Sequence, residues 1–439
     1  MREVTEPPSP VPISAEEADR ALAGLETYDR IVIAVSGGAD STTLMHLAVE
    51  WARRKGLAPN CIQAVTVDHG LRAGSAEEAV TVSGAAAALG LAHTTKTYNG
   101  PVPAGSFAQS FARDLRYRLL AEAAHDTLTP GARAALLTAH HQDDQAETVL
   151  MRLARGSGVD GLAGIRRTRR LDDDVDLVRP LLGFPKARLQ ASLAERGAAW
   201  IDDPSNTNQR FERVRLRARA AARDALGLTT AALALSARRA ERAGVALRVA
   251  LDRCLATPAV AVHPLGWVRL DWPLLMLEPE DIRLRALVAV IAAVGGQAPV
   301  SLGALEDLTV DAGWPSVAGK TFGHCSFLAT QGSHVDVIRE PGRGQPAGRL
   351  VAPGETLFWD NRLHVRAGPG TPPGAELRWL TADGRAQALE RGGTLPPIPR
   401  EAVLTLPSLW TSQTLLSAPA LGVGGPTLTV APFELRNGA

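Results

Sequence analysis

Short apolar runs alternate with longer segments of helical periodicity through the first part of the chain. The apolar runs predict strands at residues 31–35, 61–68, 91–98 and 135–140. The segments after them predict helices at 42–54, 75–89, 106–126 and 143–155. The second helix opens on a capping-box pattern formed by Ser75 and Glu78. Strands that alternate with helices in this way predict βαβ units, and hence an α/β domain with a parallel sheet covered on both faces.

The pattern changes in the second half of the chain. Residues 215–256 are rich in Ala, Arg and Leu and predict a long helix, and helical spacing returns at 279–294 and 302–311. After Phe322, short β-like stretches are separated by many Gly and Pro residues. We therefore expect three domains: the α/β domain over 1–217, a helical linker and middle domain over 218–325, and a small mixed or β-rich C-terminal domain over 326–439.

Composition narrows the class of protein. The 439-residue chain is 45% hydrophobic, which is enough to bury more than one core. Its three cysteines, Cys61, Cys254 and Cys325, lie far apart without a CxxC pair, so no disulfide framework, zinc site or iron–sulfur site is indicated. The polar N-terminus lacks an apolar signal core, and the longest apolar run, 286–296, is too short to span a bilayer. We expect a cytoplasmic protein without a membrane segment; its oligomeric state does not follow from the sequence.

A glycine turn follows the first predicted strand, and its residues are Ser36, Gly37, Gly38, Ala39, Asp40 and Ser41. The two glycines allow the backbone to approach an anion, and the next helix offers unpaired amides at its N-terminus. The pattern matches neither Walker A nor the Rossmann fingerprint, but its chemistry is that of a phosphate cradle for ATP. Asp40 would repel phosphate unless a cation bridges them, which predicts Mg²⁺. The alternative is an ordinary glycine turn capped by Asp and Ser.

A polar run from His140 to Glu147 follows the fourth predicted strand. Asp144 and Glu147 are three residues apart and therefore share one face near a helix N-terminus. Because the carboxyl ends of parallel strands meet at one sheet edge, we expect this pair near the glycine turn, holding Mg²⁺ or a cationic substrate. Two alternatives stay open: simple partners of the helix dipole, or a His-rich metal site, although the spacing matches no zinc motif.

The motifs together resemble the tRNA(Ile)-lysidine synthase family. They occur in that family's order over roughly residues 30–217: SGGADS at 36–41, VDHGLR at 67–72, ARDLRY at 112–117, AHHQDDQAET at 139–148, GSGVDGL at 156–162 and DPSN at 203–206. Beyond residue 220 the likeness is only architectural. The resemblance implies a PP-loop fold of the adenine nucleotide alpha hydrolase type for the first domain.

The resemblance also implies a reaction. ATP adenylates the C2 oxygen of the wobble cytidine in a CAU-anticodon isoleucine tRNA and releases pyrophosphate, and free L-lysine then attacks C2 and expels AMP. Asp40 and Asp144 are expected to hold Mg²⁺, while Asp144 and Glu147 orient the lysine ammonium and accept its proton. His140 is expected to contact phosphate or the base. Arg113 is expected to neutralise the adenylate phosphate or to contact RNA.

A local excess of basic residues suits an RNA partner, although the net charge of the whole chain is only +1. Residues 152–219 hold 15 Lys and Arg against 9 Asp and Glu. We expect Arg213, Arg215 and Arg217 to bind tRNA; a solvated helix face is the alternative. Two positions depart from the family pattern, Asn208 and Val214. The C-terminal domain is poor in Lys, so the sequence does not explain how this tRNA is distinguished from CAU-anticodon methionine tRNAs.

Two other functions are alternatives to this one. One is a different enzyme of the same superfamily, either a tRNA thiolase or an amide-forming synthetase. The cysteines are not placed as a thiolase pair, and no amidotransferase nucleophile motif is apparent. The other is RNA or nucleotide binding without catalysis, against which Asp40, Asp144 and Glu147 argue, because binding alone needs no magnesium pair.

Overall fold

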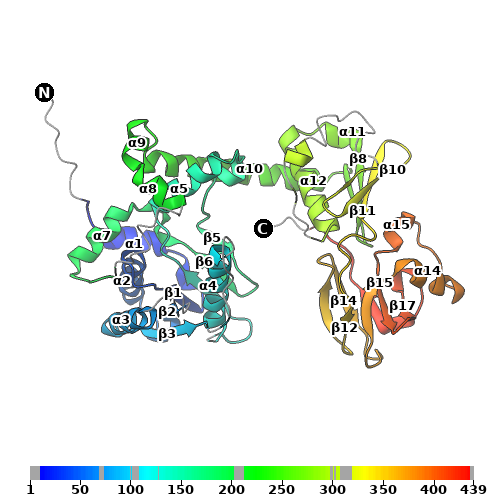
Figure 1. Ribbon diagram of the computed structural model, residues 1–439, viewed down its shortest axis with the longest axis horizontal. Coiled ribbons are helices and arrows are strands. Elements are labelled where there is room, and N and C mark those ends of the chain that lie inside the picture. Colours follow the sequence, from blue (N-terminus) through cyan, green and yellow to red (C-terminus); the bar gives the residue numbers. More distant parts are fainter. Residues whose placement is uncertain are drawn as a thin grey trace. The chain divides into compact units, whose positions relative to one another are not determined.

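The computed structural model describes residues 10–68, 74–98, 100, 108–126, 128–201, 212–296, 300, 303–306 and 319–435. The chain forms two compact units, residues 1–244 and 245–439 (Figure 1). The predicted motifs at 69–72 and 203–206, and Asn208, lie outside the described residues.

The first unit is built on a six-stranded sheet. Its strand order is β3-β2-β1-β4-β6-β5, and every pair is parallel except β5 with β6. The strands are β1 (Arg30–Ala34), β2 (Ile62–Asp68), β3 (Ala92–Thr97), β4 (Ala134–Leu137), β5 (Thr168–Arg170) and β6 (Val175–Val178). The order reverses between β1 and β4, and ligands of open parallel sheets bind at that switch point, beyond the carboxyl ends of the strands.

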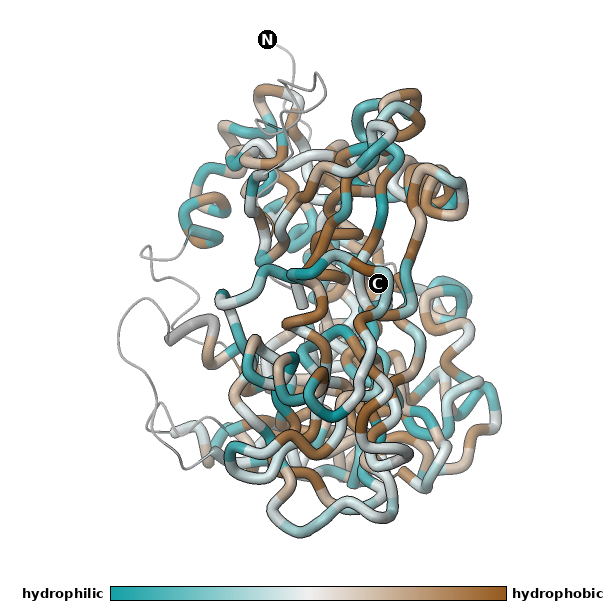
Figure 2. The backbone as a smooth tube through the Cα atoms, turned by 90° about the vertical axis from the view of Figure 1, so that its right-hand side faces the viewer, coloured by the Kyte–Doolittle hydropathy of each residue, from teal (hydrophilic) through white to brown (hydrophobic). Residues whose placement is uncertain are grey.

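Helices cover both faces of this sheet, as the alternating pattern predicted. Ile31 and Ile33 of β1 pack into one core with α1, α2 and α3, whereas Val32 packs into a second core with α4. Figure 2 colours the backbone by hydropathy, and hydrophobic and hydrophilic stretches alternate along the chain. The helices of the first unit are α1 (Ala15–Leu22), α2 (Ala39–Arg54), α3 (Ser75–Ala88), α4 (Ala108–His125), α5 (Gln142–Leu153), α6 (Val159–Leu162) and α7 (Lys186–Glu195).

Two local predictions need correction. The N-cap residue of α3 is Gly74, with a φ of 98°, so Ser75 is the first helical residue and not the cap of the predicted capping box. The single long helix predicted over 215–256 is three helices, α8 (Glu212–Ala218), α9 (Ala220–Ala225) and α10 (Thr230–Leu255). Gly227, with a φ of 78°, lies in the break before α10, where left-handed backbone cannot continue a helix.

The second unit is mostly antiparallel sheet around one large hydrophobic core, with two smaller hydrophobic clusters beside it. A five-stranded sheet has the order β7-β8-β11-β10-β9, with α11 (Trp272–Met276) and α12 (Glu280–Val294). Its strands are β7 (Val260–His263), β8 (Trp267–Asp271), β9 (Thr321–Phe322), β10 (Cys325–Ala329) and β11 (His334–Arg339). The predicted helix at 279–294 is thus confirmed as α12, whereas β7 and β8 were not predicted.

Two smaller sheets complete the second unit. One has the order β12-β15-β16-β17 and the other β13-β14-β18. The remaining elements are β12 (Arg349–Leu350), β13 (Thr356–Trp359), β14 (Leu363–Ala367), β15 (Glu376–Trp379), α14 (Thr381–Glu390), α15 (Arg400–Val403), β16 (Pro407–Thr411), β17 (Thr414–Ser417) and β18 (Leu428–Val430).

The predicted fold class is confirmed: a parallel-dominated α/β sheet, helices in the middle of the chain, and a β-rich end. The domain boundaries at 217 and 325 stay a prediction. Within the described ranges, the chain has no helix of the length and apolarity that a bilayer crossing requires.

Candidate active site

The glycine turn between β1 and α2 has the hydrogen bonding of a rigid anion cradle. Gly37 has a φ of 82°, and Gly38 is the N-cap residue of α2 without a side-chain cap. The Ser36 amide donates to Ser41 Oγ at 3.1 Å, and Ser41 Oγ donates to the Gly38 carbonyl at 3.0 Å. The side chains therefore fix the turn and leave the first-turn amides of α2 for a ligand.

A cavity of about 220 Å³ opens beside this turn, at the switch point of the sheet. Its polar wall combines residues from the two predicted motifs with two arginines: Ser36, Asp40, Ser41, Thr138, His140, Asp144, Arg116 and Arg213. Its apolar wall includes Ala34, Val35, Val65, Val67 and Leu120. The cavity thus combines hydrogen-bond donors with an apolar surface, a combination typical of nucleotide-binding sites.

His141 joins the two motifs across the cavity. Its Nε2 lies 3.5 Å from Asp40 Oδ2 and 3.5 Å from Asp144 Oδ2, and its Nδ1 lies 3.5 Å from Asp143 Oδ2. Asp144 Oδ2 also accepts the His141 amide at 3.1 Å, which closes the N-terminus of α5. The imidazole is buried. It therefore links Asp40 and Asp144 from a position that is closed to solvent.

The two adjacent histidines have opposite pKa shifts. Burial lowers the pKa of His140 to about 3, so its ring is neutral at physiological pH, and its Nδ1 lies 3.1 Å from Thr138 Oγ1. Burial also opposes charge on His141, but Asp143, Asp40 and Asp144 outweigh it and raise its pKa to about 9. Charge on His141 is thus favoured by three carboxylates and opposed by burial and by the Asp143 amide, which donates to its Nδ1 at 3.2 Å, whereas His140 is a neutral hydrogen-bonding group.

Carboxylates beside His141 are kept ionised. Burial would raise the pKa of Asp40, but the hydrogen bond and charge of His141 and the charge of Lys186 lower it overall. The pKa of Asp143 is likewise lowered, because His141 and the Lys186 amide outweigh the effect of burial. One oxygen of Asp40, Oδ1, is buried without a hydrogen-bond partner. Such an orphaned carboxylate oxygen is chemically suited to a cation.

Arginines of α8 contact the acidic pair of α5. Arg217 donates from Nε to Glu147 Oε1 at 2.5 Å and from Nη2 to Asp144 Oδ1 at 3.4 Å. Arg213 lies 4.0 Å from both carboxylates. Glu147 is buried and does not line the cavity, whereas Asp144 does. The predicted lysine-binding pair thus consists of Asp144, which lines the cavity, and Glu147, which does not line it and is bound by Arg217.

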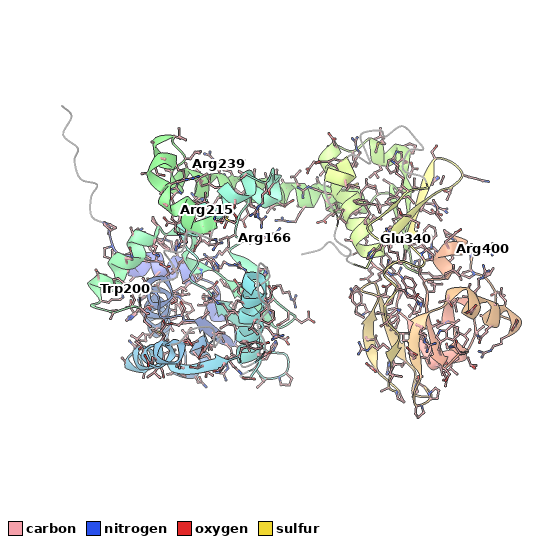
Figure 3. All side chains as sticks on the ribbon, viewed as in Figure 1. Arg166, Trp200, Arg215, Arg239, Glu340 and Arg400 are labelled. Carbon is pink, nitrogen blue, oxygen red and sulfur yellow. The ribbon has the colours of Figure 1, made fainter. Side chains whose placement is uncertain are left out.

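An arginine-lined groove of about 520 Å³ adjoins the cavity, and Arg213 lines both. Its basic lining is Arg113, Arg152, Arg155, Arg166, Arg169, Arg179 and Arg213, with Asp160 as an acidic member. Arg113 and Arg169 both pack on the Tyr117 ring, 5.4 and 5.5 Å from its centroid. Arg166 and Arg215 are marked in Figure 3; Arg215 is exposed on α8 and lines neither cavity nor groove.

The structure therefore brings most predicted site residues together, but on two surfaces. Ser36, Asp40, Ser41, His140 and Asp144 share the cavity, and Arg113 lies on the groove. His141 was not among the predicted residues, although it lies within the predicted motif. Lys186 carried no local signal; its ammonium is 3.6 Å from Asp40 Oδ2. Within the described ranges, no three His, Cys, Asp or Glu side chains cluster as ligands for one metal ion.

Comparisons with known proteins agree with this geometry. Residues 12–223 match the PP-loop domain family, which implies ATP binding. The chain is 43% identical to a tRNA(Ile)-lysidine synthase of Bradyrhizobium sp. over 68% of this chain and 83% of that protein. It is 36% identical to one of Ruegeria pomeroyi over 92% of this chain and 91% of that protein.

One similar solved structure is the U34-tRNA thiolase NcsA of Methanococcus maripaludis with its 4Fe-4S cluster. It is 16% identical in sequence, and the match covers 52% of this chain and 77% of that one with a TM-score of 0.41. The sequence identity to these two synthases extends over 83% and 91% of their lengths, and it shows the family of the chain. The chain belongs to the tRNA(Ile)-lysidine synthase family and is an enzyme of this kind.

Proposed function

We propose that the chain joins lysine to C2 of the wobble cytidine in a CAU-anticodon isoleucine tRNA through an adenylated tRNA intermediate. ATP is converted to AMP and pyrophosphate, and the product is lysidine. The names of the relatives supply the tRNA and the product. The observation that carries the proposal is the junction at His141, which brings Asp40 of the phosphate cradle and Asp144 of α5 to one cavity.

In the first step, the C2 oxygen of cytidine attacks the α-phosphorus of ATP, and the bond to the pyrophosphate oxygen breaks. The amides at the start of α2 and the Ser36 hydroxyl stabilise the charge that develops on phosphate, while the Ser41 hydroxyl, which donates to the Gly38 carbonyl, holds the turn. Asp40 and Asp144 are the residues that fit Mg²⁺, because Asp40 Oδ1 is orphaned and both carboxylates line the cavity. When bound, Mg²⁺ offsets the negative charge of the phosphates.

In the second step, the neutral ε-amine of lysine attacks C2, and the C2–oxygen bond to AMP breaks. Asp144 lines the cavity and accepts the amine proton. Glu147 is a positioning residue in this scheme, because both its oxygens bind Arg217, which in turn contacts Asp144. Neutral His140 donates a hydrogen bond to phosphate or base rather than serving as a strong base.

The arginine groove is our proposed RNA track. Its basic lining next to the cavity suits phosphates that flank the target nucleotide. Arg213 is the member that also reaches the cavity, so we keep it as a tRNA contact. Arg215 stays a predicted RNA contact on the exposed face of α8, while the interactions of Arg217 with Glu147 and Asp144 favour a role in the active site.

The proposal is tested by combining protein, ATP, Mg²⁺, radiolabelled lysine and the isoleucine tRNA transcript. Lysine label in the tRNA with pyrophosphate release is expected; folded protein that leaves the tRNA unlabelled would sink the proposal. Asp40→Ala should abolish pyrophosphate release and leave tRNA binding within about twofold, because Asp40 lies outside the arginine groove. Lost tRNA binding would instead mean that Asp40 supports the RNA site.

A further inference from the structure

The phosphate cradle contains no cation of its own. Its six residues are two serines, two glycines, an alanine and an aspartate, so its one charged side chain has the same sign as ATP. A Walker A loop, in contrast, ends in a lysine that reaches the terminal phosphates. Cations for the triphosphate must therefore come from outside the cradle. Arg116 and Arg213 line the cavity, and Lys186 is a further cation, with its ammonium 3.6 Å from Asp40 Oδ2 of the cradle itself.

The main chain around Lys186 is anchored to α5 and to α2. Lys186 is the first residue of α7, and its amide donates to Asp143 Oδ2 at 2.9 Å. Two residues earlier, the Phe184 carbonyl accepts the Gln142 amide at 2.9 Å. Farther along, Thr43 Oγ1 of α2 donates to the Leu189 carbonyl at 3.1 Å. The backbone is thus held between α2 and α5, while the side chain is 38% exposed.

Lys186 is also unusual in composition. The chain holds 47 Lys and Arg residues, of which only Lys55, Lys96, Lys186 and Lys320 are lysines. In a chain that uses arginine for nearly every cationic position, a lysine beside the cradle indicates a need for a compact, mobile point charge.

A purely structural role explains this placement poorly. The Lys186 and Asp40 side chains are 38% and 28% exposed, and ion pairs of that exposure contribute little to stability. The pairing does neutralise Asp40 while no nucleotide is bound. A triphosphate in the cradle would lie beside Asp40 and would offer the ammonium several anionic oxygens.

We propose that Lys186 is a phosphate-binding residue for adenylation, which contacts the β- and γ-phosphates of ATP and stabilises the departing pyrophosphate. The inference rests on the proposed function. As the C2 oxygen bonds to the α-phosphorus, the electron pair of the breaking bond passes to the pyrophosphate oxygen, and the ammonium offsets that charge without giving up a proton. Lys186 exchanges Asp40 for phosphate when ATP binds.

The test compares Lys186→Met with Lys186→Arg and with Lys55→Met. Lys55 is the matched control, because it is an exposed lysine at the opposite end of α2. ATP affinity is measured by calorimetry, pyrophosphate release by a coupled assay with the tRNA, and folding by thermal melting. Lys186→Met should slow pyrophosphate release by about 100-fold and weaken ATP binding, as expected for a lost charged contact to the transition state. Lys186→Arg should recover part of the loss, and Lys55→Met should match the wild type.

Folding and function are separated by two further readouts. Melting temperatures within about 2 °C of the wild type exclude a folding defect; if Lys186→Met melts lower, Lys186→Gln replaces it. Should the wild type release no pyrophosphate, the proposed function fails, and ATP affinity alone then decides the role of Lys186. The inference is overturned if Lys186→Met matches the wild type within about twofold in ATP affinity. Where pyrophosphate release is measurable, it must match within the same factor.

Discussion

Replacing Gly37 by alanine tests whether the geometry of the cradle is required for ATP binding. Gly37 has a φ of 82°, a conformation that costs an L-residue about 1–2 kcal/mol. An added Cβ would lie 2.6 Å from Ile201 Cδ1 and 3.1 Å from Val82 Cγ2. Overpacking of that kind costs about 1–3 kcal/mol. The Ile201 main chain is held, because its amide donates to the Gly37 carbonyl at 2.9 Å, so relief of the clash depends on rotation of the Ile201 side chain.

Together these terms destabilise the cradle by about 2–5 kcal/mol. Part of that strain is relieved in the free protein if the loop moves, and the rest must be overcome when ATP binds. We expect Gly37→Ala to raise the dissociation constant for ATP at least about tenfold, which corresponds to about 1.4 kcal/mol. Calorimetric titration with ATP measures the loss of ATP affinity. A urea unfolding curve on the same sample measures the loss of folding stability.

The steric part can be separated from the backbone part with a second substitution. Ile201→Ala removes the nearest atom, so Gly37→Ala/Ile201→Ala should regain ATP affinity relative to Gly37→Ala, with Ile201→Ala alone as the control. The remaining loss measures the cost of the positive φ. A Gly37→Ala protein with wild-type affinity and stability would refute the argument, and a double variant without recovery would rule out the Ile201 contact as the cause.

Two further predictions concern ion pairs of the first unit. The hydrogen bond from Arg188 lowers the pKa of Glu17 from 4.5 to about 2, so the contribution of Glu17 to stability is present above pH 4.5 and is lost as pH falls toward 2. Because the pair is partly exposed, urea unfolding should show Glu17→Gln less stable by about 1 kcal/mol at pH 7, with the difference reduced at pH 3 and closed only near pH 2; a gap that widens on acidification contradicts this. Arg217→Met leaves the buried Glu147 carboxylate without its main partner and should cost about 1–3 kcal/mol. In a double-mutant cycle, Arg217→Met/Glu147→Gln should cost less than the sum of the single changes, and strict additivity would mean that the pair is not coupled.

Several features of the site followed from local sequence alone. The apolar run at 31–35 and the helical spacing after the glycine turn predicted β1, the cradle and α2 in order, and the run from His140 predicted the start of α5. These predictions succeeded because strand, turn and helix signals depend on residues within a few positions of one another. The parallel sheet then placed both motifs at one edge, as the βαβ pattern requires.

Other features depended on segments that are distant along the chain. No local pattern predicted β7 and β8, two short strands of a larger antiparallel sheet. Arg217, for which the sequence predicted an RNA contact, is bound to Glu147, 70 residues earlier, a contact that no local pattern indicated. Lys186 likewise contacts Asp40 only because α7 packs beside α2.

The sequence by itself determined the identity and order of the reactive groups: the cradle at 36–41, the carboxylates of α5 and the surplus of arginine at 152–219. Only the tertiary structure decided which of them line the cavity, which lie outside it and which cation lies beside Asp40. The physical reason is that hydrogen-bond and charge partners are chosen by the packing of α2, α5, α7 and α8 against one another and the sheet, and no residue's local neighbours specify that packing.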